Sequence, residues 1–137
     1  MGRRGATSDN HAMATGKASN PIVDRTTLFG LQIIDLYRAL PRSQEAVVLG
    51  KQVLQSGTSV GATIREARRS RTVTEMISKT EHALQELDET SYWLELLEKS
   101  GIVPAERFTA IRQETDELMA MLVKSAKTLK ARRANNP

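Results

Sequence analysis

The chain has 137 residues, of which 39% are hydrophobic and 4% aromatic, with no cysteine and a formal net charge of +4. This length suits one domain, whose core must be mainly aliphatic. The absence of cysteine excludes disulfides, thiolate zinc sites and cysteine nucleophiles, and it fits a reducing cytoplasm. No stretch approaches the ~20 apolar residues of a membrane span, so we expect no membrane partner.

Residues 1–20 are rich in Gly, Ala, Ser, Thr and Asn, and Met is their only large apolar residue. Such a segment cannot bury enough surface to offset the entropy lost on ordering. The composition therefore predicts a disordered N-terminal arm over 1–20, a helical domain over 21–131 and a frayed tail over 132–137.

A first helix is predicted from Asp24, its N-cap, to Leu40. Its apolar residues are spaced by four, three and four, which places them on one helical face. These residues are Phe29, Ile33, Leu36 and Leu40. Pro41 ends the helix, because the residue before a proline avoids the helical region.

A second helix is predicted from Ser43, a favourable N-cap, to about Arg69. Gly57 and Gly61 lie inside it, and each interior glycine costs about 0.5–1 kcal/mol relative to alanine. A break near Gly57 is one interpretation. A continuous helix is favoured, because the apolar residues keep the same phase on both sides of the glycines. The small side chains would then let another helix approach closely.

Thr72 and Glu75 have the spacing of a capping box, which predicts the start of a third helix, and Gly101 is a natural stop. Pro104 suits the first turn of a fourth helix. The predicted apolar seam of the third helix is Met76, Ala83, Leu87, Leu94 and Leu97. That of the fourth is Phe108, Ile111, Thr115, Leu118, Leu122, Ser125 and Leu129, a heptad pattern.

The four predicted helices are joined by short connections, and no long run alternates with the period of a strand. Short loops between long helices make chain neighbours antiparallel. The sequence therefore predicts an all-α protein, an antiparallel up-down-up-down four-helix bundle.

Two motifs lie on the second and third predicted helices: Ser56-Gly-Thr-Ser-Val-Gly-Ala-Thr-Ile-Arg-Glu-Ala67 and Ala83-Leu-Gln-Glu-Leu-Asp-Glu-Thr-Ser-Tyr-Trp-Leu-Glu-Leu-Leu97. Together they resemble the four-helix bundle family named for proteins encoded in 23S rRNA intervening sequences, over roughly Asp24 to Lys130. The resemblance assigns the first motif to helix packing, through Ser56, Gly57, Thr58, Ser59, Gly61, Thr63 and Glu66. The family usually has asparagine where this chain has Thr63, so any role of that amide does not carry over.

The resemblance also implies an assembly. Members of the family form ring-shaped homopentamers, and their cellular role is largely unassigned. Distant relatives are accessory proteins to the reverse transcriptases of diversity-generating retroelements, where they contact nucleic acid. The resemblance therefore implies two partners for this chain: further copies of itself, and RNA or DNA.

Neither histidine has the setting of a metal ligand or a catalytic base. His11 lies in the predicted arm, and His82 lies alone on the third helix. Di-iron bundles use Glu-x-x-His pairs, whereas the residue three before His82 is Lys79. The carboxylates of the third helix are spread around it, which favours a solvated face over acid catalysis. We therefore expect no catalytic residue, no metal and no cofactor.

Glu66 lies seven residues after Ser59, close to the Gly, Ser and Thr residues of the second helix. It is interpreted as a structural polar contact to hydroxyl or amide groups of that region, rather than as a pocket residue, because a buried carboxylate must be paired.

Basic residues gather near the ends of the second and fourth helices. They are Arg65, Arg68, Arg69, Arg71, Lys124, Lys127, Lys130, Arg132 and Arg133. Positive charge near a helix C-terminus is favourable by a few tenths to about 1 kcal/mol, which explains the clusters structurally. In the predicted topology both ends meet at one pole, where they could also attract phosphates. Tyr92 and Trp93 are interpreted as packing or subunit-contact residues.

The sequence thus predicts a non-enzymatic, self-assembling bundle that acts as a scaffold or nucleic-acid accessory protein. A protein-interaction module without a nucleic-acid role is the alternative. A third, less favoured reading is an enzyme or small-ligand binder with a site between subunits.

Overall fold

The computed structural model describes residues 20–136. It contains four long helices, α2 (Pro21–Ala39), α3 (Gln44–Arg68), α4 (Val73–Lys99) and α5 (Thr109–Asn135), and a short 3-10 helix, η2 (Ala105–Phe108). No strand occurs between residues 20 and 136, so the expected all-α class is confirmed. The predicted arm, apart from Asn20, and with it His11, lies outside the described residues.

The start of α2 differs from the sequence prediction. Asn20, not Asp24, is the N-cap, and its side-chain Oδ1 accepts hydrogen bonds from the amides of Ile22 and Val23, both 3.1 Å long. Pro21 then occupies the first helical position, where its missing N–H costs nothing. The sequence prediction placed the start one turn late, and Asp24 instead lies in the first turn.

The helix α3 runs without interruption through Gly57 and Gly61, as predicted. A Cβ built on Gly57 would lie 2.7 Å from Ile33 Cγ1, and one on Gly61 would lie 3.3 Å from the Thr26 carbonyl oxygen. The two glycines therefore bring the backbone of α3 against α2. The expected close approach is confirmed. Its reason is visible only in the structure, where α2 leaves no room for a side chain at either position.

The predicted capping residues of α4 are confirmed with one change in bonding. The Thr72 hydroxyl accepts from the Glu75 amide at 3.0 Å, but the Glu75 carboxylate accepts from the Arg71 amide instead of returning to Thr72. At the other end, Gly101 has a φ of 76°, the left-handed conformation that glycine tolerates best.

The fourth helical segment begins as a 3-10 turn after Pro104 and becomes α-helical at Thr109. It remains helical to Asn135, further than the predicted tail boundary. Its buried face nearly matches the predicted seam, except that Ala126 is buried where Ser125 was expected. Ser125 is half-buried.

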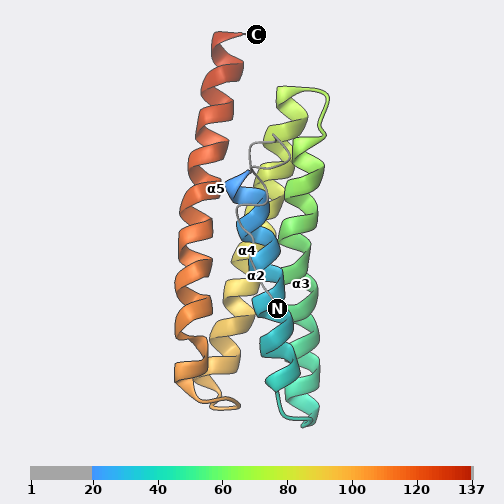
Figure 1. Ribbon diagram of the computed structural model, residues 1–137, viewed down its shortest axis with the longest axis vertical. Helices are drawn as coiled ribbons and strands as arrows, with labels where there is room; N and C mark the ends of the chain where they lie inside the picture. The colour runs from blue at the N-terminus through green and yellow to red at the C-terminus, as the bar shows by residue number, and fades with distance from the viewer. Residues whose placement is uncertain (1–19, 137) are drawn as a thin grey trace, which may run out of the picture.

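The core is aliphatic with two phenylalanines, Phe29 and Phe108, both fully buried. In Figure 1, successive long helices run in opposite directions along the long axis, so α3 and α5 both end at the pole where α4 begins. Each helix packs against its neighbours in the chain, and α2 also contacts α5, which closes the bundle.

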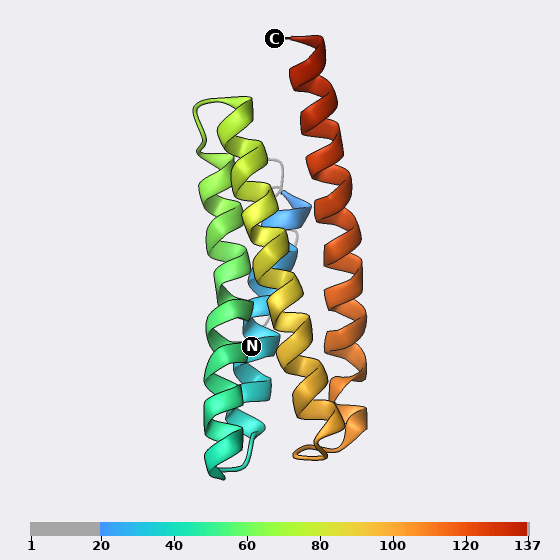
Figure 2. The same cartoon turned by 180° about the vertical axis from the view of Figure 1, so that it is seen from behind.

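The helices do not end at the same level. At the pole where α3 and α5 end, α2 begins at a lower level than the ends of its neighbours. The last turns of α5 extend beyond the α3–α4 loop (Figures 1 and 2). We call this pole the basic end. It carries the nine basic residues that the sequence singled out, Arg65, Arg68, Arg69, Arg71, Lys124, Lys127, Lys130, Arg132 and Arg133.

Candidate nucleic-acid interface

The basic end combines the last turns of α3, the loop to α4 and the last three turns of α5. Lys130 Nζ forms a 2.6 Å ion pair with Glu81 of α4. Among residues 20–136, it is the only one of the nine basic residues that pairs with a carboxylate. Most of the positive charge at this end is therefore not neutralised by neighbouring carboxylates of the described chain.

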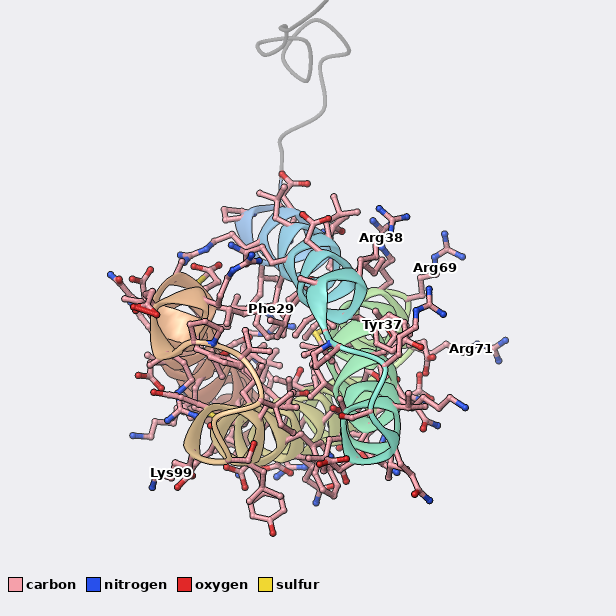
Figure 3. The ribbon with its side chains drawn as sticks, turned by 90° about the horizontal axis from the view of Figure 1, so that it is seen from below. Phe29, Tyr37, Arg38, Arg69, Arg71 and Lys99 are labelled. Carbon is pink, nitrogen blue, oxygen red and sulfur yellow. The ribbon has the colours of Figure 1, made fainter. Side chains whose placement is uncertain are left out.

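Two of the nine make a bond to a threonine hydroxyl. Arg65 Nη2 donates to Thr27 of α2 at 3.1 Å, and Arg133 Nη1 donates to Thr74 of α4 at 3.5 Å. These weak, exposed contacts leave other guanidinium donors available. Seen along the bundle axis, Arg69 and Arg71 point away from the bundle, while Phe29 lies between the helices (Figure 3).

The opposite pole has a more balanced charge. Lys99 pairs with Glu95 at 2.7 Å, and Arg112 lies 3.6 Å from Glu98. The hydrogen bond and charge of Lys99 lower the pKa of Glu95. The excess of positive charge in the described chain thus belongs mainly to the basic end.

The hydroxyl residues Ser56 and Thr63 of the small-residue motif lie in a seam between α3 and α4, whereas its glycines face α2. The Thr90 hydroxyl, fully buried on α4, is 2.8 Å from Ser56 Oγ and 2.7 Å from the Glu86 carbonyl oxygen. Ser56 in turn donates to the Gln52 carbonyl oxygen. Every hydroxyl in this seam has a partner, as buried polar groups require. Ser56 and Thr90 therefore join α3 to α4 in this seam.

Thr63 also has a definite role in that seam. It is buried, and its hydroxyl donates to Glu86 Oε1 at 2.7 Å. His82 Nε2 lies 3.5 Å from the other oxygen of the same carboxylate. Sequence reasoning missed Glu86, because nothing in the helical pattern distinguishes it from the other acidic residues of α4.

Glu66 does not make the contacts that were predicted for it. Its side chain is exposed and accepts from Lys79 Nζ of α4 at 2.8 Å, instead of from the hydroxyl groups of α3. Lys79 lowers the pKa of Glu66 through this hydrogen bond and its charge. The predicted structural partner exists, but it is a lysine on the neighbouring helix, because Glu66 lies on the outer side of the α3–α4 contact.

A second feature that the sequence did not reveal joins α2 to α5. Arg25 Nη2 lies 2.6 Å from Glu114 Oε1 and 2.8 Å from Glu117 Oε1, and Arg25 Nε donates to Glu114 Oε2. The guanidinium therefore binds Glu114 through two nitrogens, the geometry that makes arginine–carboxylate pairs specific. The partners are about 90 residues apart in the chain, so no local pattern could have indicated them.

Tyr92 and Trp93 lie on α4, with ring centroids 5.1 Å apart. Tyr92 is exposed, and Trp93 Nε1 is buried without a hydrogen-bond partner among the described residues. The predicted role of these two residues in subunit contact stays a prediction.

An apolar groove runs between the outer sides of α2 and α3. Gly30, Ile34, Gly61 and Ala62 are among the residues that line its volume of about 350 Å³. Leu31 lies at this groove and is 53% exposed, and Leu28, one turn earlier, is 59% exposed. We call this face the α2–α3 groove.

Within residues 20–136, no group of three His, Asp or Glu side chains is placed to hold a metal ion. No helix in the same range combines the length and apolar character needed to cross a lipid bilayer.

Four helices around an aliphatic core, with a hydroxyl-lined seam and a basic end, define a helical-bundle protein. The model of the family described as 23S rRNA-intervening sequence protein matches residues 19–124, and the chain belongs to that family. The resemblance seen in the two sequence motifs is thereby confirmed.

A solved structure is similar to this chain over most of its length. It is a protein of unknown function from the S23 ribosomal protein family of Bacteroides thetaiotaomicron, 37% identical, with a TM-score of 0.73. The similarity covers 77% of this chain and 98% of the other. No curated protein matches the chain.

Proposed function

We propose that this protein is a self-associating helical bundle whose basic end binds the phosphate backbone of RNA or DNA. The observation that carries the proposal is the group of nine basic residues at one pole, of which only Lys130 pairs with a carboxylate between residues 20 and 136. Lysine and arginine side chains that neutralise phosphates release counterions, which supplies most of the affinity of non-specific binding.

The proposed contact is to backbone and not to bases. The basic end has Arg and Lys side chains on α3 and α5, whereas the described aromatic pair, Tyr92 and Trp93, lies in the second half of α4. Binding to single strands by base stacking requires aromatic platforms beside the charged groove. We therefore expect little sequence specificity and a strong dependence on salt.

The test is RNA and DNA binding by the full chain as a function of salt. The variant Lys127→Gln/Arg132→Gln/Arg133→Gln should lower the slope of log K against log salt by about 3, one for each lost phosphate contact. The control Arg38→Gln/Arg42→Gln/Lys51→Gln makes the same change of charge at the other pole and should leave the slope unchanged. No affinity for either nucleic acid at low salt would refute the proposal.

Self-association is proposed to form a ring of five copies, as the family resemblance implies, and the α2–α3 groove supports a contact between copies. Leu28 and Leu31 expose apolar surface beside a groove floored by glycines, an arrangement typical of helix docking. Light scattering should give about five times the 15.2 kDa monomer mass. The variant Leu28→Ser/Leu31→Ser should lower that mass, whereas Val48→Ser, equally exposed on α3, should not. A monomer mass for the unmodified chain would refute the ring.

The same groove favours a second candidate function, a protein-interaction module with no nucleic-acid role. In that case the positive charges at the basic end would only offset the dipoles of α3 and α5. The two candidates differ in one measurement: salt-dependent binding of nucleic acid is expected for the first and absent for the second.

A further inference from the structure

A hollow of about 250 Å³ opens among the helix ends at the basic end of the bundle. Side chains from all four long helices line it, and its wall is mainly apolar. The apolar residues around it are Ile22, Ile64, Ala67, Met76, Leu122 and Leu129. We call this hollow the mouth.

The mouth exists because the helices have unequal lengths. The helix α2 has 19 residues, whereas α3 has 25 and α5 has 27. Near the pole, α3, α4 and α5 therefore continue past the start of α2, and α2 borders the hollow only with its first turn, through Ile22. Ile64 and Leu129 are 3% and 7% exposed, so these parts of the apolar wall are buried side chains of the core.

Polar groups surround the mouth on the solvent side. Arg68 is exposed and has no carboxylate partner within residues 20–136. Asn20 uses its Oδ1 to cap α2, and its Nδ2 donates no hydrogen bond to the described chain. Ser125 adds a hydroxyl from α5. The rim thus offers hydrogen-bond donors and positive charge around an apolar interior.

We infer that the mouth binds a single-chain anionic amphiphile, with its alkyl chain among the four helix ends and its carboxylate at Arg68. The apolar wall fits the chain, and the unpaired guanidinium fits the charged group. An engineered cavity of about 150 Å³ holds the six carbons of benzene, so this volume corresponds to roughly ten carbons. Decanoate is therefore the probe of matching size and charge.

A peptide helix fits less well. An α-helix with its side chains is about 10–12 Å across and needs a long groove between two helices. The mouth is instead a hole at the end of the bundle, bounded on several sides by α2, α3, α4 and α5. The inference goes beyond the proposed function, because it concerns a small ligand and does not require nucleic acid or assembly.

The test is calorimetric titration of the full chain, free of nucleic acid, with hexanoate, octanoate and decanoate below their micellar concentrations. Each buried methylene should strengthen binding about fourfold, so decanoate should bind roughly fifteen times more tightly than octanoate. Decanol, which has the same chain without the charge, should bind more weakly than decanoate by about fivefold.

Two matched pairs of variants locate the site. Arg68→Gln should weaken decanoate binding by about fivefold. Arg69→Gln makes the same change at the next residue of the chain, which does not line the mouth, and should leave the affinity within twofold. Ser125→Leu should fill the hollow and abolish saturable binding. Thr128→Leu, an exposed change on the same helix away from the mouth, should not.

Several results would overturn the inference: no saturable binding of decanoate, equal binding of decanol, or equal effects of Arg68→Gln and Arg69→Gln. If Ser125→Leu changes the mass of the assembly while decanoate does not bind, the mouth belongs to a second copy of the chain. Nucleic-acid binding is measured separately, so failure here leaves the proposed function standing, and the reverse also holds.

Discussion

The middle of the bundle and its basic end are built from the same four helices but differ in packing. In the middle, Gly57 and Gly61 bring α3 against α2 so closely that a single added Cβ would meet Ile33 at 2.7 Å. At the basic end, a hollow of about 250 Å³ separates side chains of the same helices. Helix length, as well as the pattern of apolar residues, therefore decides where side chains pack closely in the bundle and where a hollow remains.

The largest expected effect is the loss of a large side chain from the middle. Phe29 is fully buried in the core, so Phe29→Ala should lower the free energy of unfolding by about 3–5 kcal/mol. Leu129 is also buried but borders the hollow of the mouth, so Leu129→Ala should lose fewer packing contacts and cost only about 2 kcal/mol. Urea denaturation of both variants measures the contrast, and equal losses would contradict it.

Adding a methyl group should have opposite effects at two glycines. Gly57→Ala should destabilise the protein by about 1 kcal/mol, because overpacking against Ile33 outweighs the gain in helix propensity. Gly30→Ala, where a Cβ would meet no atom within 4 Å, should stabilise it by about 0.5–1 kcal/mol. Thermal unfolding of the pair provides the test, and stabilisation by Gly57→Ala would show that α2 and α3 are less tightly packed.

Filling the mouth should stabilise the protein, in contrast to filling the middle. Ser125→Leu places an apolar side chain beside Leu122 and Leu129 and should raise the free energy of unfolding by about 1 kcal/mol. The control Thr128→Leu, on the exposed face of α5, should change it by less than about 0.5 kcal/mol. A destabilised Ser125→Leu protein would mean that the mouth is smaller than the structure shows.

The smallest effect concerns pH. The hydrogen bond from Arg25, supported by Gln113, lowers the pKa of Glu117 below its ordinary value of 4.5. The stabilisation from this carboxylate is therefore complete above 4.5 and is lost as pH falls through the lowered pKa. Because the pair is exposed, the change is small. Glu117→Gln should flatten the fall in urea midpoint below pH 4.5, and a fall of the same steepness would contradict the assignment.

The predicted helices were recovered from the sequence because their signals are local. The apolar spacing from Phe29 to Leu36, the cap at Thr72 and the glycine stop at Gly101 all act within a few residues. The same local reasoning placed the start of α2 at Asp24, whereas Asn20 followed by Pro21 is the stronger signal. That error depended on treating residues up to 20 as one disordered segment.

The candidate sites were predicted less completely, because their partners come from distant parts of the chain. The basic residues of α3 and α5 could be listed from the sequence, and the predicted topology placed them at one pole. Glu86 as the partner of Thr63, Lys79 as the partner of Glu66, and the Arg25 contacts to α5 depend on how the helices are rotated against one another. Helical periodicity alone does not contain that rotation.

The sequence by itself determined the all-helical class, the approximate extent of four helices, the family and the excess of positive charge. These properties follow from periodicity, capping residues, motif spacing and composition, which are all read along one dimension. Only the tertiary structure decided that Gly57 lies against Ile33 and that a short α2 leaves an apolar mouth beneath Arg68. Those features depend on the relative height and rotation of packed helices, which the chain fixes only when it folds.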